Sequence, residues 1–226
     1  MQRRQFTSLL IAAGCAGGVT PARAGLLSQA DASLGVKTAL ERGALAAVGL
    51  LGRDGGFLAN PKVRIPLPGF LDDLARMARF TGQQERVDSL VAAMNHAAEL
   101  AVPEARDMLV SAARAITVQD AVKIVRGGDT SVTDYFAGKT RKPLTSRFLP
   151  IVTQATERVS LAEKYNALAG KASGMGLVRQ EDANLQSYVT RKALDGLYLV
   201  IGDEERKIRQ DPVGTGSDIL RKVFGG

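Results

Sequence analysis

The chain of 226 residues contains one cysteine, one histidine and no tryptophan. Cys15 lies in a segment that we expect to be removed, so the mature chain would have no disulfide, no thiolate nucleophile and no cysteine metal ligand. His96 lies off the apolar stripe of its predicted helix, where we expect it to be solvated. A single histidine makes neither a metal site nor a catalytic triad by itself. We therefore expect no metal and no cofactor, with stability supplied by packing.

Familiar catalytic motifs are missing as well. The sequence has no H-E-x-x-H, no G-x-S-x-G and no phosphate-binding P-loop, which argues against zinc proteases, serine hydrolases and nucleotide-binding enzymes. Tyr188 and Lys192 have the Y-x-x-x-K spacing of short-chain dehydrogenases, but no dinucleotide-binding half accompanies them. We interpret them as a surface pair one helical turn apart.

Aromatic residues are also few, with four tyrosines and seven phenylalanines. The basic run at 139–142 therefore has no aromatic platform beside it, and we expect no nucleic-acid binding. The formal charge of +7 falls to +4 once the three arginines of residues 1–24 are removed, because that segment contains no acid. This charge indicates a soluble protein with a mild preference for anionic surfaces.

The first 24 residues are typical of a signal peptide. Arg3 and Arg4 precede a short uncharged stretch, and Ala22-Arg23-Ala24 has the small-x-small pattern of a cleavage site. The sequence RRQF favours the twin-arginine pathway, with a general secretory signal as the alternative. A lipoprotein anchored through Cys15 is a minor alternative, because alanine stands where the cleavage box usually has leucine. The apolar stretch is too short to span a bilayer, so we expect a periplasmic protein with no transmembrane segment.

Residues 25–226 show helical periodicity almost throughout and are expected to form a single all-α domain, a multi-helix bundle. Thr117 and Asp120 have the spacing of a capping box, and Pro150 predicts a kink or a break. Residues 55–69 (GGFLANPKVRIPLPG) are expected to form a proline- and glycine-rich non-helical loop. Residues 170–184 are expected to form a glycine-rich connector, followed by a long helix over residues 185–209.

Two polar clusters are candidate sites. Asn95 and Glu99 lie four residues apart at the edge of an apolar helical stripe, where they need partners, and Arg106 and Arg114 are the candidates. We favour a polar network that fixes the helix register over a ligand site. The segment GGDTS at 127–131 could hold an anion at a helix start, but a helix–helix turn capped by Asp129 agrees better with the charge.

Six blocks occur in order along the chain: GGFLANPKVRIPLPG, MNHAAELAVPEA, GGDTSVTDYF, RFLPIV, KYNAL and YVTRKALDGLYLVIGDEERKIRQDP. Together they resemble the DUF4197 family of exported bacterial proteins. The resemblance implies a helical, secreted protein and brings no reaction with it. In the last block Arg191 stands where related sequences often have an acid, which argues against a role for a charge there. The blocks contain these polar candidates for a ligand site or a structural network: Arg64, Asn95, Glu99, Asp129, Thr130, Asp134, Tyr135, Tyr165, Asn166 and Asp195.

Three functions remain open. The first is non-enzymatic binding of a lipid or another apolar ligand, enclosed by a bundle that is kinked at Pro150 and covered by the proline-rich loop. The second is an envelope scaffold that binds a protein partner through an exposed apolar patch. The third is an enzyme that uses Glu99, Asp134 and Tyr135 as acid–base groups. We rank them in this order, so an enzyme is the least favoured.

Overall fold

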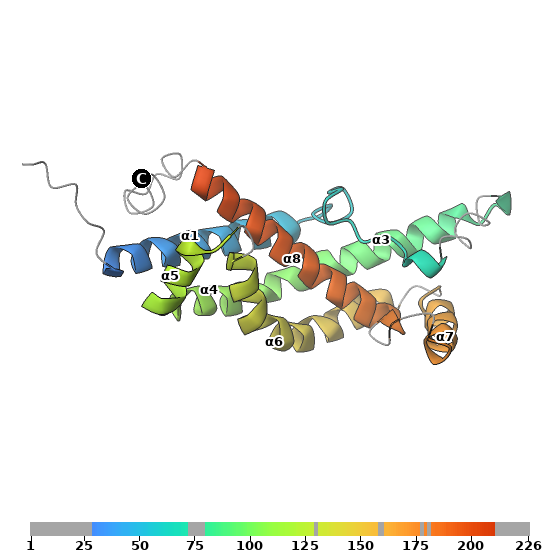
Figure 1. Cartoon of the computed structure of the whole chain (residues 1–226). Coiled ribbons are helices and arrows are strands. Elements are labelled where there is room, and N and C mark those ends of the chain that lie inside the picture. Colours follow the sequence, from blue (N-terminus) through green and yellow to red (C-terminus); the bar gives the residue numbers. More distant parts are fainter. Residues whose placement is uncertain are drawn as a thin grey trace, which may run out of the picture.

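The computed structural model describes residues 29–71, 80–128, 131–157, 161–176, 179 and 182–210 (Figure 1). These residues contain helices and no strand, which confirms the all-α prediction. The predicted signal peptide, Cys15, Asp129, Thr130 and the chain beyond Gln210 lie outside the described residues. The α-helices are α1 (Gln29–Leu51), α3 (Gln84–Ala101), α4 (Arg106–Arg114), α5 (Val118–Arg126), α6 (Ser131–Thr156), α7 (Leu161–Gly174) and α8 (Leu185–Gln210). The described residues also include the 3₁₀ helices η1 (Gly69–Leu71) and η2 (Val102–Ala105).

The core is built around α8, which crosses the bundle and packs against α6, α1 and α3 (Figure 1). Its inward residues Leu194, Leu197 and Ile201 are fully buried, and the face of α1 that runs from Val36 to Leu51 packs against it and is buried too. Apolar residues three and four apart share one helical face, so removing these two stripes from water drives the helices together.

Local signals set several helix ends. Thr117 and Asp120 form the predicted capping box at the start of α5: the Asp120 N–H donates to Thr117 Oγ1 at 3.1 Å, and the Thr117 N–H donates to Asp120 Oδ2 at 3.3 Å. The Thr117 hydroxyl and N–H bonds hold the pKa of Asp120 below its usual value. Pro103 lies in the first turn of η2, directly before α4, where its missing N–H costs no helical hydrogen bond.

Pro150 does not break its helix, because α6 continues from Ser131 to Thr156 through both Pro143 and Pro150. The two prolines are seven residues apart, which places them on one face, and both are exposed. The carbonyls that lose their partners therefore face water, which can bond to them. α6 accordingly curves along its length instead of ending (Figure 1).

The predicted connector at 170–184 starts too early, since residues 170–174 belong to α7. Gly170 and Gly174 are exposed and have no neighbour within 4 Å of an added Cβ, so the helix can pass through them. Gly176 has φ 74°, a left-handed conformation that favours glycine just after a helix end.

Residues 52–68, called the 52–68 loop below, contribute to the core. Phe57, Val63 and Ile65 are buried there, with exposed fractions of 0%, 6% and 1%. Phe57 and Val63 lie against Gly196 of α8, where an added Cβ would be 2.9 Å from Phe57 Cε1 and 3.2 Å from Val63 Cβ. The loop therefore fills the space beside α8, whereas the sequence-based hypothesis had it cover a ligand cavity.

The enclosed pocket between α1 and α8 is lined by Val36, Leu40, Ile201 and their neighbours and has a volume of about 10 Å³. This is the space of a single water molecule. Among the described helices, none combines the length and the hydropathy needed to cross a membrane.

Candidate functional site

A groove opens between α6 and α8. On α6, Arg141, Thr145 and Leu149 follow one another at intervals of four residues, so they share a face. On α8, the opposite wall consists of Ser187, Thr190, Arg191 and Leu194. Together these seven residues line a groove of about 350 Å³, called the α6–α8 groove below. This volume lies at the lower end of the range for small-molecule sites.

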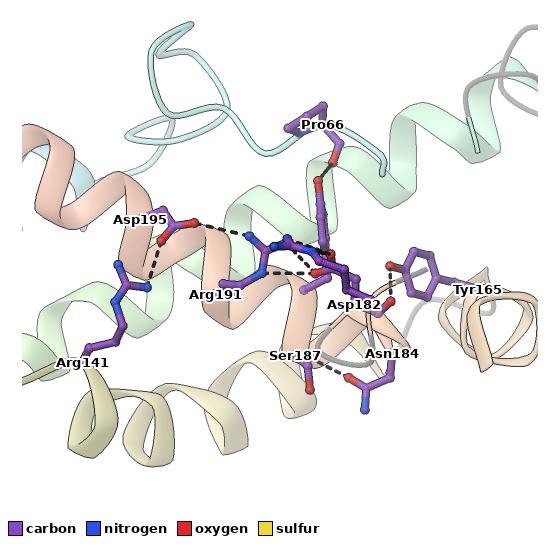
Figure 2. Close-up of polar contacts among 10 residues, drawn as sticks. Pro66, Arg141, Tyr165, Asp182, Asn184, Ser187, Arg191 and Asp195 are labelled. Atoms are coloured by element: carbon purple, nitrogen blue, oxygen red, sulfur yellow. Dashed lines mark hydrogen bonds and ion pairs between the residues drawn. The ribbon is translucent and has the colours of Figure 1, made fainter. Parts of the chain in front are cut away.

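An ionic network borders this groove (Figure 2). Arg191 donates to Asp182 through Nε at 3.1 Å and to Asp195 through Nη1 at 3.4 Å. Arg141 reaches Asp195 from α6, with Nη1 2.9 Å from Oδ1. Arg179 donates to the second oxygen of Asp182 at 3.1 Å. Two carboxylates thus hold three guanidinium groups at the edge of the groove, and these five residues are called the arginine network below.

Most N–H donors of the Arg141 side chain have no hydrogen-bond partner among the described residues. It makes one hydrogen bond, to Asp195, and its guanidinium lies 5.0 Å from the centre of the Tyr198 ring. The side chain is 40% exposed. Because a guanidinium carries five N–H groups in a planar fork, most of them are available to a group that enters the groove. A carboxylate or phosphate is the natural partner of such a fork.

Thr190 differs from the other hydroxyl residues of α6 and α8. It is 1% exposed, and its Oγ1 has no hydrogen-bond partner among the described residues. By contrast, the Thr140 Oγ1 bonds both the Phe136 carbonyl at 2.7 Å and the Tyr198 hydroxyl at 2.9 Å. A buried hydroxyl without a partner costs about 1–3 kcal/mol. Since Thr190 lines the groove, a polar atom bound there could satisfy it.

The tyrosine beneath Arg141 is held in its neutral form. Burial raises the pKa of Tyr198, while the bond with Thr140 and the charge of Arg141 oppose this shift. Tyr198 therefore supports Arg141 with a neutral ring face at physiological pH.

Asn95 and Glu99 are buried, but not against the predicted arginines. Asn95 accepts a bond from the Ile65 N–H at 2.8 Å and donates to the Ile65 carbonyl at 2.9 Å. Glu99 Oε1 accepts bonds from the N–H groups of Phe57 at 2.9 Å and Leu58 at 3.1 Å. Arg114 pairs with Glu41 instead, and Arg106 is exposed. The prediction of Arg106 and Arg114 as partners is wrong because the backbone of the 52–68 loop occupies these positions.

The sequence model of the family described as "Protein of unknown function (DUF4197)" matches residues 26–225. The chain belongs to this family. No curated protein and no solved structure matches it. The site of this DUF4197 chain must therefore be assessed from its own geometry.

Several predicted residues of the DUF4197 chain gather near the start of α8. The Tyr165 hydroxyl donates to the Asp182 carbonyl at 3.2 Å, and burial raises the pKa of Tyr165. Asn166 Oδ1 accepts a bond from the Leu185 N–H at 2.8 Å, which satisfies the first turn of α8. Asp195 belongs to the arginine network (Figure 2). Tyr165 and Asn166 thus position α7 and the entry to α8, while Asp195 borders the groove.

The remaining predicted residues lie elsewhere. The Tyr135 hydroxyl donates to the Ala112 carbonyl of α4 at 2.8 Å, and burial raises the pKa of Tyr135. Asp134 and Arg64 are exposed. Glu99 is bound to the 52–68 loop and Tyr135 to α4, so neither bonds to the other as an acid–base pair would.

Sequence reasoning missed Arg141 and Thr190 and argued against Arg191, which is a central member of the arginine network. Tyr188 was also misjudged as a surface residue: it is 4% exposed, and its hydroxyl donates to the Pro66 carbonyl at 3.0 Å. The available signal was the i, i+4 spacing of Arg191 and Asp195, which predicts an ion pair on one helical face.

Proposed function

We propose that this DUF4197 chain is exported to the periplasm and binds there, without catalysing a reaction, a lipid-like molecule that carries an anionic group. The anionic group would meet Arg141 and the Thr190 hydroxyl, and the apolar part would lie along Leu149 and Leu194. The observation that carries the proposal is that one groove brings together a guanidinium with unused donors and a buried hydroxyl, neither of them fully bonded by the described residues.

The position of the ligand differs from the sequence-based hypothesis. The pocket enclosed between α1 and α8 has room for about one water, and the 52–68 loop is packed into the core. An acyl chain therefore has more space in the open α6–α8 groove than in that pocket. Small-molecule sites usually combine an apolar lining with a few polar groups that fix orientation, and the groove has both.

Native mass spectrometry of the protein purified from the periplasm without detergent tests this proposal. We expect a stoichiometric adduct that, after denaturation, releases a molecule with an acidic group. The same spectrum reports the mature start, at Gly25 or at an acylated Cys15. The variant R141Q should lose most of the adduct. R147Q is the matched control, because Arg147 is an exposed arginine on another face of the same helix.

A protein-binding role is the second candidate, supported by a shallow depression of about 510 Å³ beside the groove. Leu149 lines both hollows, and the second also contains Pro150, Thr153, Gln154 and Glu157. Leu149 is 37% exposed. A clean apoprotein mass from native spectrometry would contradict ligand binding and favour this role. An enzyme stays the least favoured, since Glu99 and Tyr135 are committed to separate backbone partners.

A further inference from the structure

Three side chains that can bind a metal meet where the 52–68 loop passes α3. His96 Nδ1 lies 3.6 Å from Glu99 Oε2 and 4.0 Å from Asp54 Oδ1. The three ligand atoms all lie within 4.8 Å of one another. His96 and Glu99 are three residues apart on α3, so they share a face, and Asp54 comes from the loop.

Glu99 is oriented for this cluster before any ligand arrives. Its side chain is 5% exposed, and the N–H groups of Phe57 and Leu58 hold Oε1. Its other oxygen, Oε2, accepts no hydrogen bond from the described residues and faces His96. A buried carboxylate with one oxygen fixed by two backbone donors and the other left open has the second-sphere support of a metal ligand.

We propose that Asp54, His96 and Glu99 bind a divalent metal ion of the zinc class. Zinc bonds to nitrogen and carboxylate oxygen at about 2.0–2.2 Å, so tetrahedral ligand atoms lie roughly 3.4 Å apart. The two distances from His96 Nδ1, 3.6 Å and 4.0 Å, exceed this by a few tenths of an ångström, and no two of the three ligand atoms are more than 4.8 Å apart. Imidazole with two carboxylates also favours zinc and its neighbours over calcium or magnesium, which prefer oxygen alone.

A simple ion pair explains the arrangement less well. Both distances from the imidazole exceed the length of a hydrogen bond, yet the three ligand atoms all lie within 4.8 Å of one another. The side chains of His96 and Asp54 are 58% and 100% exposed, so water can complete the coordination. The bound ion would link the 52–68 loop to α3 at the solvent edge, next to the buried contacts of Asn95.

The only histidine of the chain provides a direct readout. We would follow the imidazole C–H signals of His96 by NMR while adding Zn²⁺ to the full chain, purified without a histidine tag and carrying C15S to remove the only thiol. We expect these signals to shift or broaden and to saturate near one equivalent. The thermal midpoint of unfolding should rise with added Zn²⁺, since binding to the folded state alone stabilises it.

Two variants show whether Zn²⁺ binds to the three-residue cluster or to the imidazole of His96 alone. D54N removes a fully exposed carboxylate, so its fold should be unaffected, and E99Q keeps an acceptor for the two backbone donors. Each should weaken Zn²⁺ binding by at least about tenfold. D107N, which changes an exposed acid of α4, is the control and should bind as the parent does. The proposal is overturned if the His96 signals do not move, or if D54N binds zinc as well as D107N.

Discussion

The polar side chains beneath the 52–68 loop and those along the α6–α8 groove differ in what satisfies them. Under the loop, Asn95 is fully buried, and its side chain bonds the Ile65 N–H, the Ile65 carbonyl and the Val91 carbonyl. Along the groove, Arg141 is 40% exposed and makes one hydrogen bond among the described residues. Both amide donors of Asn95 are thus used and the side chain is closed to solvent, whereas Arg141 keeps most of its donors.

Whether a polar side chain has all its hydrogen-bond partners therefore distinguishes structural residues from candidate binding residues better than burial or charge does. A buried polar group with complete backbone partners fixes the position of a segment, and removing it leaves those partners unsatisfied. A half-exposed guanidinium beside an apolar surface contributes little to stability and remains available. The Thr190 hydroxyl combines features of both, because it is buried like Asn95 yet lacks a partner among the described residues.

The largest expected effect comes from breaking the loop anchor. N95A leaves the N–H and the carbonyl of Ile65 buried without their partner, at about 1–3 kcal/mol each. We therefore expect the free energy of unfolding in urea to fall by about 3–5 kcal/mol. D134A, an exposed acid on α6, should change it by less than about 0.5 kcal/mol. An N95A loss below about 1 kcal/mol would mean that water replaces Asn95 and that the loop is not anchored there.

Two glycine substitutions test how closely the 52–68 loop packs against α8. G196A places a Cβ 2.9 Å from the buried ring of Phe57, and this overpacking should cost about 1–3 kcal/mol. G138A is the matched change on α6, where the added Cβ meets nothing within 4 Å. It should stabilise the protein by about 0.5–1 kcal/mol, since alanine favours a helix over glycine. Equal effects of the two changes in urea unfolding would contradict the close packing of the loop.

Removing the hydroxyl groups of Thr190 and Thr140 should change the free energy of unfolding in opposite directions. T190V removes a buried hydroxyl that no described residue bonds, so it should stabilise the ligand-free protein by about 1 kcal/mol while lowering the ligand occupancy seen by native mass spectrometry. T140V removes the bonds to Phe136 and Tyr198 and should destabilise by about 1 kcal/mol. Thermal unfolding of both variants measures the difference. A destabilising T190V would show that its hydroxyl is already satisfied.

The structural features that the sequence predicts correctly are those set by residues close together in the chain. Helical periodicity predicted the all-α fold and the long last helix, and the pair Thr117 and Asp120 located the start of α5, because each signal lies within a few residues of its effect. The recognition of Asn95 and Glu99 as residues that need partners rested on the same periodicity.

The partners themselves could not be predicted, because they are backbone groups some 30–42 residues away along the chain. The role of Arg141 likewise depends on where α6 crosses α8, which neither helix encodes alone. The connector was predicted to start at Gly170, which is too early, because an exposed glycine can end a helix or be tolerated within it. Only the surrounding packing decides between the two.

The smallest expected effect concerns the ion pair that joins the exposed edge of the 52–68 loop to α8. Lys62 Nζ lies 2.8 Å from Asp203 Oδ2, and this bond, with help from Arg206, holds the pKa of Asp203 below its usual value. A carboxyl with a lowered folded-state pKa stabilises the protein above its unfolded pKa, near about 3.9, and loses that contribution as the pH falls through the folded value. Because Lys62 is largely exposed, D203N should cost less than about 1 kcal/mol at pH 7. The difference between the parent and D203N in urea unfolding should then shrink as the pH falls below about 3.9. A difference that does not shrink as the pH falls would mean that Asp203 acts through packing, and that the loop has a second structural anchor at its exposed edge.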